Sequence, residues 1–249
     1  MTNPLPDPAG PALSVIAPCY NEELNVDPLC TRMLAVFDGM DVKAELVLVD
    51  DGSKDETWAR ITAAMARDPR VRGVRHDKNR GIVGGWLSGL AHAEAPLVCL
   101  IDSDLQNRPE DVPRLHDAYV KKEPDLVQAV RHPEGSVTRL VFSKGLNALL
   151  NVTFGMHLRD NKSGFIVCRR EVLADILADA PGYRYFQSFI GVAAGVRHYT
   201  ITEVDTVFEE RNAGESFLSG FPAMVSLRIV KELLRYRSAT WSRQRRGRS

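Results

Sequence analysis

The sequence predicts an α/β protein with a mostly parallel central sheet. In its first half, short apolar runs rich in Val, Ile and Leu alternate with segments whose apolar residues recur at helical spacing. Acidic residues stand directly after two of the apolar runs. The alternation is typical of parallel strands joined by helices, and acids in those positions are typical of a ligand site at the carboxyl ends of such strands.

The first half contains the clearest pattern. Strands are expected at residues 13–18, 45–49, 71–75 and 96–101. Helices are expected between them, at residues 22–38, 57–66 and 81–93. In the first of these helices, Leu29, Met33 and Phe37 recur on one face, as they do in a helix that packs on a core.

The second half follows a different pattern. Strands are expected at 125–130, at 164–167 and within 196–208, and helices at 138–153, 170–178 and 224–236. No repeat and no long linker divides the chain. We therefore expect one domain over 13–236, made of two parts at 13–125 and 126–236. Residues 1–12 are expected to form a flexible lead-in, without a secretory signal, and 237–249 a basic tail.

Composition limits the classes of function. The chain has 249 residues, 44% hydrophobic and 26% charged, which suits one globular domain. Its formal net charge of zero gives no reason to expect nucleic acid as a partner. The four cysteines are far apart and lack metal-ligand spacing, so we expect buried, reduced thiols. The histidines show no ligand spacing either, and no metal role is assigned to them.

Two pairs of acidic residues are candidates for a ligand-binding site. Asp50 and Asp51 follow one expected strand, and Asp102 and Asp104 follow another. Because parallel strands end at the same edge of a sheet, both pairs are expected to border one crevice. Mg²⁺ and Mn²⁺ prefer oxygen ligands, and such a cation neutralises a diphosphate. Each aspartate also has a purely structural alternative, as a turn residue or a helix cap.

Six motifs in order resemble family 2 of the glycosyltransferases, and more narrowly the polyprenyl-phosphate glycosyltransferases of the dolichol-phosphate mannose synthase group. They are PCYNEE at 18–23, VDDGS at 49–53, NRG at 79–81, DSDLQ at 102–106 with Pro109–Glu110, DNKSGF at 160–165 and RNAGES at 211–216. The resemblance implies the GT-A fold, a Rossmann-like nucleotide-sugar-binding fold with a mixed, mostly parallel sheet. It makes 13–125 the expected donor half and 126–236 the expected acceptor half. It also implies an inverting enzyme that transfers a sugar from a UDP- or GDP-sugar to a dolichyl or undecaprenyl phosphate.

The resemblance also implies roles for individual residues. Those expected around the nucleoside are Pro18, Tyr20, Glu22, Val49 and Asp51, with Ser103 against the ribose. Those expected to bind Mg²⁺ or Mn²⁺ are Asp102, Asp104 and Gln106. Arg131 is expected near the transferred sugar or its phosphate, and Arg211 at the diphosphate. The acceptor phosphate is expected at Arg139, Ser143 and Lys144.

Two other functions remain open at this point. An enzyme with the same donor site could act on a soluble or glycan hydroxyl, and Asp160 would then be the candidate general base. The chain could instead be a nucleotide-sugar binding module without turnover. Phe217 favours the module, because it follows Ser216 where the family usually has a lysine. The retained Asp102, Asp104 and Arg211 favour an enzyme.

The C-terminal segment predicts a membrane partner. Eight basic residues accompany the single acid Glu232 between positions 228 and 249: Arg228, Lys231, Arg235, Arg237, Arg243, Arg245, Arg246 and Arg248. An apolar face of Val225, Ile229, Leu233 and Leu234 is expected beside them. Residues 217–249 are therefore predicted to bind a membrane surface, with the protein peripheral on its cytoplasmic side. The alternative is that this apolar face packs on the domain.

Overall fold

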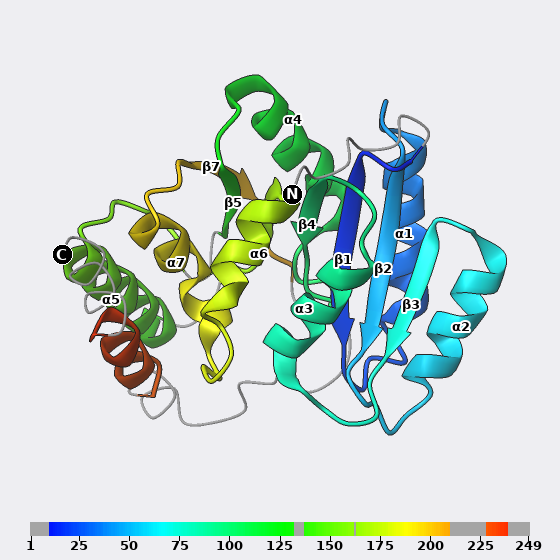
Figure 1. The fold of residues 1–249 in the computed structure, drawn as a ribbon, viewed down its shortest axis with the longest axis horizontal. Coiled ribbons are helices and arrows are strands. Elements are labelled where there is room, and N and C mark those ends of the chain that lie inside the picture. Colours follow the sequence, from blue (N-terminus) through cyan, green and yellow to red (C-terminus); the bar gives the residue numbers. More distant parts are fainter. Residues whose placement is uncertain (1–9, 132–136, 162, 210–227, 239–249) are drawn as a thin grey trace, which may run out of the picture.

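The computed structural model describes residues 10–131, 137–161, 163–209 and 228–238. One seven-stranded sheet runs through this part of the chain in the order β3-β2-β1-β4-β6-β5-β7 (Figure 1). Its strands are β1 (Leu13–Cys19), β2 (Ala44–Asp50), β3 (Val71–Arg75), β4 (Leu97–Leu100), β5 (Leu126–Arg131), β6 (Ile166–Arg169) and β7 (Ile201–Thr206). Only β6 is antiparallel to its neighbours, so the expected mixed, mostly parallel sheet is confirmed.

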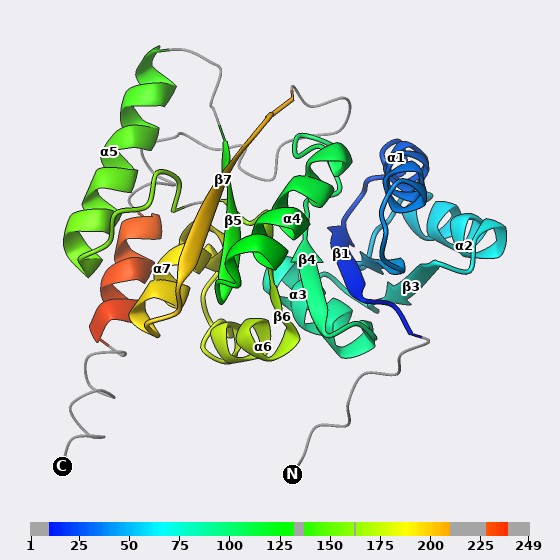
Figure 2. The ribbon, with the colours of Figure 1, turned by 90° about the horizontal axis from the view of Figure 1, so that it is seen from above.

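Helices cover both faces of the sheet (Figures 1 and 2). They are α1 (Val26–Asp38), α2 (Thr57–Arg67), α3 (Gly81–His92), α4 (Val112–Lys122), α5 (Val137–Phe154), α6 (Arg170–Ala178) and α7 (Ile190–Val196), with 3₁₀ turns at Pro109–Asp111 and Phe186–Phe189. One apolar core lies under α1, α2 and α4, and a second lies under α3, α6 and α7. All four cysteines are buried and unbridged in these cores, as expected, and burial raises the pKa of Cys30 to about 11.

Several boundaries differ from the expected ones. Helix α1 begins at Val26 instead of residue 22, because residues 22–25 form a turn in which the Glu22 carbonyl accepts the amide of Asn25 at 2.9 Å. Neither α4 nor α7 is anticipated by the sequence pattern. Helix α7 is short and almost wholly buried, so it shows no alternation of polar and apolar faces.

The helix formed by residues 228–238 packs on the domain and lies beside α5 and α7 in both views (Figures 1 and 2). Ile229 and Leu233 are buried in the core together with Tyr236. The prediction that these two residues lie in a membrane interface is therefore wrong, since the domain itself covers them. Leu234 is 57% exposed, and Val225 lies outside the described residues. No helix in the described ranges has the length and apolar character needed to cross a bilayer.

Two glycines allow α3 to lie close to β1. A Cβ atom on Gly85 would stand 2.7 Å from Cβ and 3.0 Å from Cγ of Pro18, and one on Gly89 would collide with Ile16. Pro18 cannot move aside by changing rotamer, because its ring is closed onto the backbone. This close packing also places the first residue of α3, Gly81, beside the end of β2.

We expect Gly85→Ala to destabilise the fold by about 1–3 kcal/mol, because the added methyl group overpacks the contact with Pro18. Gly145→Ala is the matched control, since it lies in helix α5 with nothing within 4 Å of its built Cβ. The control should be neutral or stabilising by up to about 1 kcal/mol. Thermal or denaturant unfolding measures both, and equal stability of the two variants would contradict the proposed contact.

Candidate functional site

The loop after β4 presents three oxygen-bearing side chains on one side. Asp102, Asp104 and Gln106 are partly exposed, whereas the alternate residues Ser103, Leu105 and Asn107 are buried. The buried set anchors the loop: Ser103 Oγ donates to the Pro18 carbonyl at 2.8 Å, and Asn107 Nδ2 donates to Asp102 Oδ2 at 3.0 Å. The three predicted ligands therefore share the solvent side of a firmly held loop.

Backbone strain accompanies this arrangement. Leu105 has a φ of 62°, in the left-handed region that non-glycine residues rarely adopt. Its side chain is nevertheless 1% exposed and packs in the core under α1 and α4. Burial of Leu105 thus holds the turn in a conformation that local preferences disfavour, and such strain is typical of ligand-binding loops.

An ion-pair network ties the same loop to α1. The guanidinium of Arg32 holds both carboxylate oxygens of Glu110, at 2.6 and 2.8 Å, and it also reaches Glu209 at 3.3 Å. The hydrogen bond raises the pKa of Arg32 and lowers that of Glu110. The Glu209 amide donates to the Gln106 carbonyl at 2.8 Å. Glu209 is therefore fixed at the loop after β4, whereas Arg211 lies outside the described residues.

The carboxylate of Asp51 is held by several hydrogen-bond donors. Its Oδ1 accepts the amide of Arg80 at 2.8 Å and contacts His76 Nδ1 at 2.7 Å, and its Oδ2 accepts the amide of Gly81 at 2.8 Å. Gly52, with a φ of 72°, lets the chain after Asp51 lie close to the Lys78 backbone, from which a Cβ at this position would be only 2.5 Å away. The carboxylate is oriented before any ligand arrives, and Oδ2, which has one contact, retains a lone pair for a further donor.

His76 is a site residue that the sequence reasoning missed. It is 4% exposed, and its Nε2 lies 2.8 Å from Ser88 Oγ on α3. The two contacts of the ring join Asp51, after β2, to Ser88 on α3. Its position directly after the strand 71–75 was an available signal, since that strand ends at the same sheet edge as the acidic pairs.

Arg131 lies among the acids. Its Nε is 2.8 Å and its Nη2 3.3 Å from the two carboxylate oxygens of Asp160, and its guanidinium stacks on Phe208 at 5.5 Å. Burial lowers the pKa of Arg131, but the charges of Asp160, Asp102 and Asp104 outweigh this effect and raise it overall. The fold thus brings Arg131, from the second half of the chain, into the field of the acidic triplet.

The remaining predicted residues are less closely gathered. Tyr20 is 37% exposed in the loop after β1, and Glu22 is buried with Asn25 as its partner. The side chain of Val49 is fully buried in the core, so only its backbone faces the end of the sheet. Lys144 is exposed on α5. The side chains of Arg139 and Ser143, and the whole of Phe217, lie outside the described residues.

The donor set at β4 suits a hard divalent cation. Asp102, Asp104 and Gln106 supply only oxygen atoms, which Mg²⁺ and Mn²⁺ prefer, and Asn107 holds Asp102 from behind as outer partners of metal ligands do. Among the described residues no group of three or more His, Cys, Asp or Glu side chains is placed to hold a metal ion. A cation at this loop would therefore keep coordination positions for the oxygens of a diphosphate.

Comparison with known families agrees with this geometry. The model of the family described as "Glycosyl transferase family 2" matches residues 14–177, a segment that includes β1 to β4, the acidic loop and Asp160. The chain belongs to this family. Its fold is the GT-A fold. A glucosyl-3-phosphoglycerate synthase from Mycobacterium tuberculosis, solved with Mn²⁺ and UDP-glucose, superposes with a TM-score of 0.68 at 24% identity, covering 91% of this chain and 79% of that one.

The names of two curated relatives of this family 2 glycosyltransferase chain include a lipid phosphate. An undecaprenyl-phosphate 4-deoxy-4-formamido-L-arabinose transferase from Shewanella sediminis is 34% identical over 218 residues, which is 86% of this chain. A dolichol-phosphate mannosyltransferase from Pyrococcus furiosus is 28% identical over 232 residues, which is 90% of this chain. The chain spans 64% of the length of each relative.

We expect Asp102→Asn and Asp104→Asn each to lower the rate of nucleotide release from a nucleotide sugar by roughly a hundredfold or more, because each removes one charge that holds the cation. Both should also weaken Mn²⁺ binding in calorimetry. Asp117→Asn, an exposed acid on α4, is the matched control and should change neither. Unchanged Mn²⁺ affinity in both site variants would refute the metal assignment.

Proposed function

We propose that this chain is an inverting, metal-dependent glycosyltransferase that moves a sugar from a UDP- or GDP-sugar to a polyprenyl phosphate. The observation that carries the proposal is the position of Arg131, whose positive charge stands in the field of Asp102, Asp104 and Asp160 at one sheet edge. A fixed cation beside an acidic metal loop suits a reaction in which phosphate groups meet on both sides of one sugar. The two lipid-phosphate relatives support the acceptor class.

The residues divide the work between donor and acceptor. Asp51, oriented by the amides of Arg80 and Gly81, accepts an N–H of the base. Tyr20 and Pro18 flank the nucleoside, and Ser103 lies against the ribose. Asp102, Asp104 and Gln106 would hold a divalent cation, which would supply positive charge to neutralise the departing diphosphate. Arg211 is proposed to add a second positive charge there. Arg139, Ser143 and Lys144 are proposed to receive the acceptor phosphate.

Arg131 then orients the reacting groups. One oxygen of the acceptor phosphate attacks the anomeric carbon as the bond from that carbon to the diphosphate oxygen breaks, which inverts the configuration. The acceptor phosphate is already ionised at neutral pH, so the reaction needs no general base. Asp160, whose two oxygens face the guanidinium of Arg131, accordingly serves to hold that arginine.

A comparison of two acceptors that differ only in the phosphate tests this function. A short polyprenyl phosphate, the matching polyprenol and a blank are each incubated with the protein, Mn²⁺ and labelled UDP- or GDP-sugars. We expect nucleotide release and lipid labelling with the phosphate alone. Labelling of the polyprenol alone would support a hydroxyl acceptor with Asp160 as base. Tight nucleotide binding without release in any mixture would support the binding module.

We further propose that the protein works at the cytoplasmic face of a membrane, which residues 217–249 contact. Within the described part of that segment, Arg228, Lys231 and Arg235 line a groove together with Arg184. The acid of this groove, Glu232, accepts the amides of Arg184 and Tyr185 at 3.0 and 2.9 Å. The exposed side of the helix therefore keeps a positive surface that suits anionic headgroups.

The triple variant Arg228→Gln/Lys231→Gln/Arg235→Gln should bind vesicles of phosphatidylcholine and phosphatidylglycerol roughly a hundredfold more weakly, since each basic residue near such a surface contributes ~1 kcal/mol. Flotation measures the binding. Arg114→Gln/Lys121→Gln/Lys122→Gln on α4 removes the same charge elsewhere and should bind as the wild type does. An equal loss in both triples would show that net charge alone, not this helix, governs binding.

A further inference from the structure

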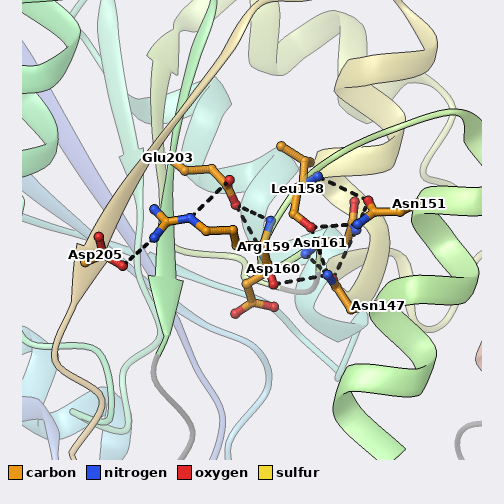
Figure 3. A network of polar contacts seen from close by, with 8 residues as sticks. All are labelled: Asn147, Asn151, Leu158, Arg159, Asp160, Asn161, Glu203 and Asp205. Atoms are coloured by element: carbon orange, nitrogen blue, oxygen red, sulfur yellow. Dashed lines mark hydrogen bonds and ion pairs between the residues drawn. The ribbon is translucent and has the colours of Figure 1, made fainter.

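A cluster of three asparagines joins α5 to the loop that carries Asp160 (Figure 3). Asn147 and Asn151 stand one turn apart on α5 and so share one face of it. Asn147 Nδ2 donates to the carbonyls of Leu158 and Arg159 at 2.8 and 3.1 Å, and Asn151 Nδ2 donates to the Leu158 carbonyl at 2.8 Å.

Asn161 completes the cluster from the loop side. Its backbone amide and its Nδ2 donate to Asn147 Oδ1 at 2.8 and 3.0 Å, and the same Nδ2 donates to Asn151 Oδ1 at 2.9 Å. The Asn161 side chain is fully buried. The buried Nδ2 group of Asn161 keeps its acceptors only while α5 stays where it is, because a shift of the helix would leave that donor unpaired.

Strand β7 holds the same loop from the opposite side. Glu203 Oε1 accepts the amides of Arg159 and Asp160 at 2.7 and 3.2 Å. With Asn151 accepting the amide of Leu158 at 3.2 Å and Asn147 accepting that of Asn161, four consecutive backbone N–H groups end on side-chain oxygens. Neither helix nor sheet fixes this segment, so its path is set by side chains from α5 and β7.

The loop in turn fixes Arg131. Asp160 sits in the middle of the four-residue segment, and its carboxylate pairs with the guanidinium of Arg131 at 2.8 Å. A continuous set of polar contacts therefore runs from Asn147 and Asn151 on α5, through residues 158–161, to Arg131. A movement of α5 cannot leave Arg131 in place unless these contacts break.

We infer that Asn147, Asn151 and Asn161 are positioning residues, which hold α5 in register with Arg131 so that the acceptor and the donor sugar meet. The inference rests on the proposed function, in which α5 carries the acceptor contacts. None of the three needs to touch a substrate. Their effect is geometric, and a displacement of reacting groups by about 1 Å can cost a hundredfold in rate.

The test compares Asn147→Ala with Val152→Ala, an α5 residue that is 84% exposed. In the lipid-phosphate assay, Asn147→Ala should lower kcat/KM for the acceptor by about 10- to 100-fold. The affinity for the nucleoside diphosphate should stay unchanged. Val152→Ala should retain wild-type kinetics. A purely structural role would lower donor binding and acceptor turnover together, in step with a falling folded fraction, and would overturn the inference.

Hydrogen exchange separates this inference from the proposed function. Asn147→Ala should speed the exchange of the amides at 158–161 by at least about tenfold and leave those at 102–107 unchanged, whether or not any acceptor is turned over. Unchanged exchange at 158–161 would refute the asparagine contact itself. A wild-type protein that transfers no sugar, combined with faster exchange in the variant, would refute the function and keep the contact.

Discussion

The charge of Arg131 and the carboxylates around it form the interaction on which the arrangement of the site depends. Asp102 and Asp104 bring negative charge to the end of β4, and like charges so placed repel one another unless a cation lies nearby. Arg131, at the end of β5, supplies a permanent positive charge. Asp160 orients its guanidinium through two contacts. The antiparallel strand β6 makes this possible, because it lies between β4 and β5 and leaves both ending at the same edge.

Two loops reach that edge by different physical means. The acidic loop after β4 is anchored by burial of Leu105 and by the bonds of Ser103 and Asn107, so its partly exposed residues face one way. The loop at 158–161 has no such core anchor along its backbone and depends on side-chain oxygens from α5 and β7. The loop after β4 is thus held by packing, whereas the loop at 158–161 is held by polar contacts with helix α5 and strand β7.

Sequence reasoning succeeded where a local signal existed. The strands up to β4 and the helices α2, α3 and α6 are each predicted within about two residues, because apolar periodicity and strand-end acids are read within one short segment. It did not predict α7, because a helix that is buried on all sides shows no periodic alternation of polar and apolar residues. It also placed Ile229 and Leu233 at a membrane, whereas they lie in the core. An apolar helical face looks the same in sequence whether a membrane or the protein's own core covers it, so that choice belongs to tertiary packing.

The sequence by itself determined the family and the mixed α/β sheet, and it predicted which acids bind the metal, since ordered motifs and strand-end positions can be read without knowledge of the fold. Only the tertiary structure decided which distant groups meet. The contact of His76 with Asp51, the pairing of Arg131 with Asp160 and the asparagine bridge from α5 join residues that are 25, 29 and 14 positions apart. Such pairs leave no periodic trace in the chain, because they depend on where strands end and helices pack.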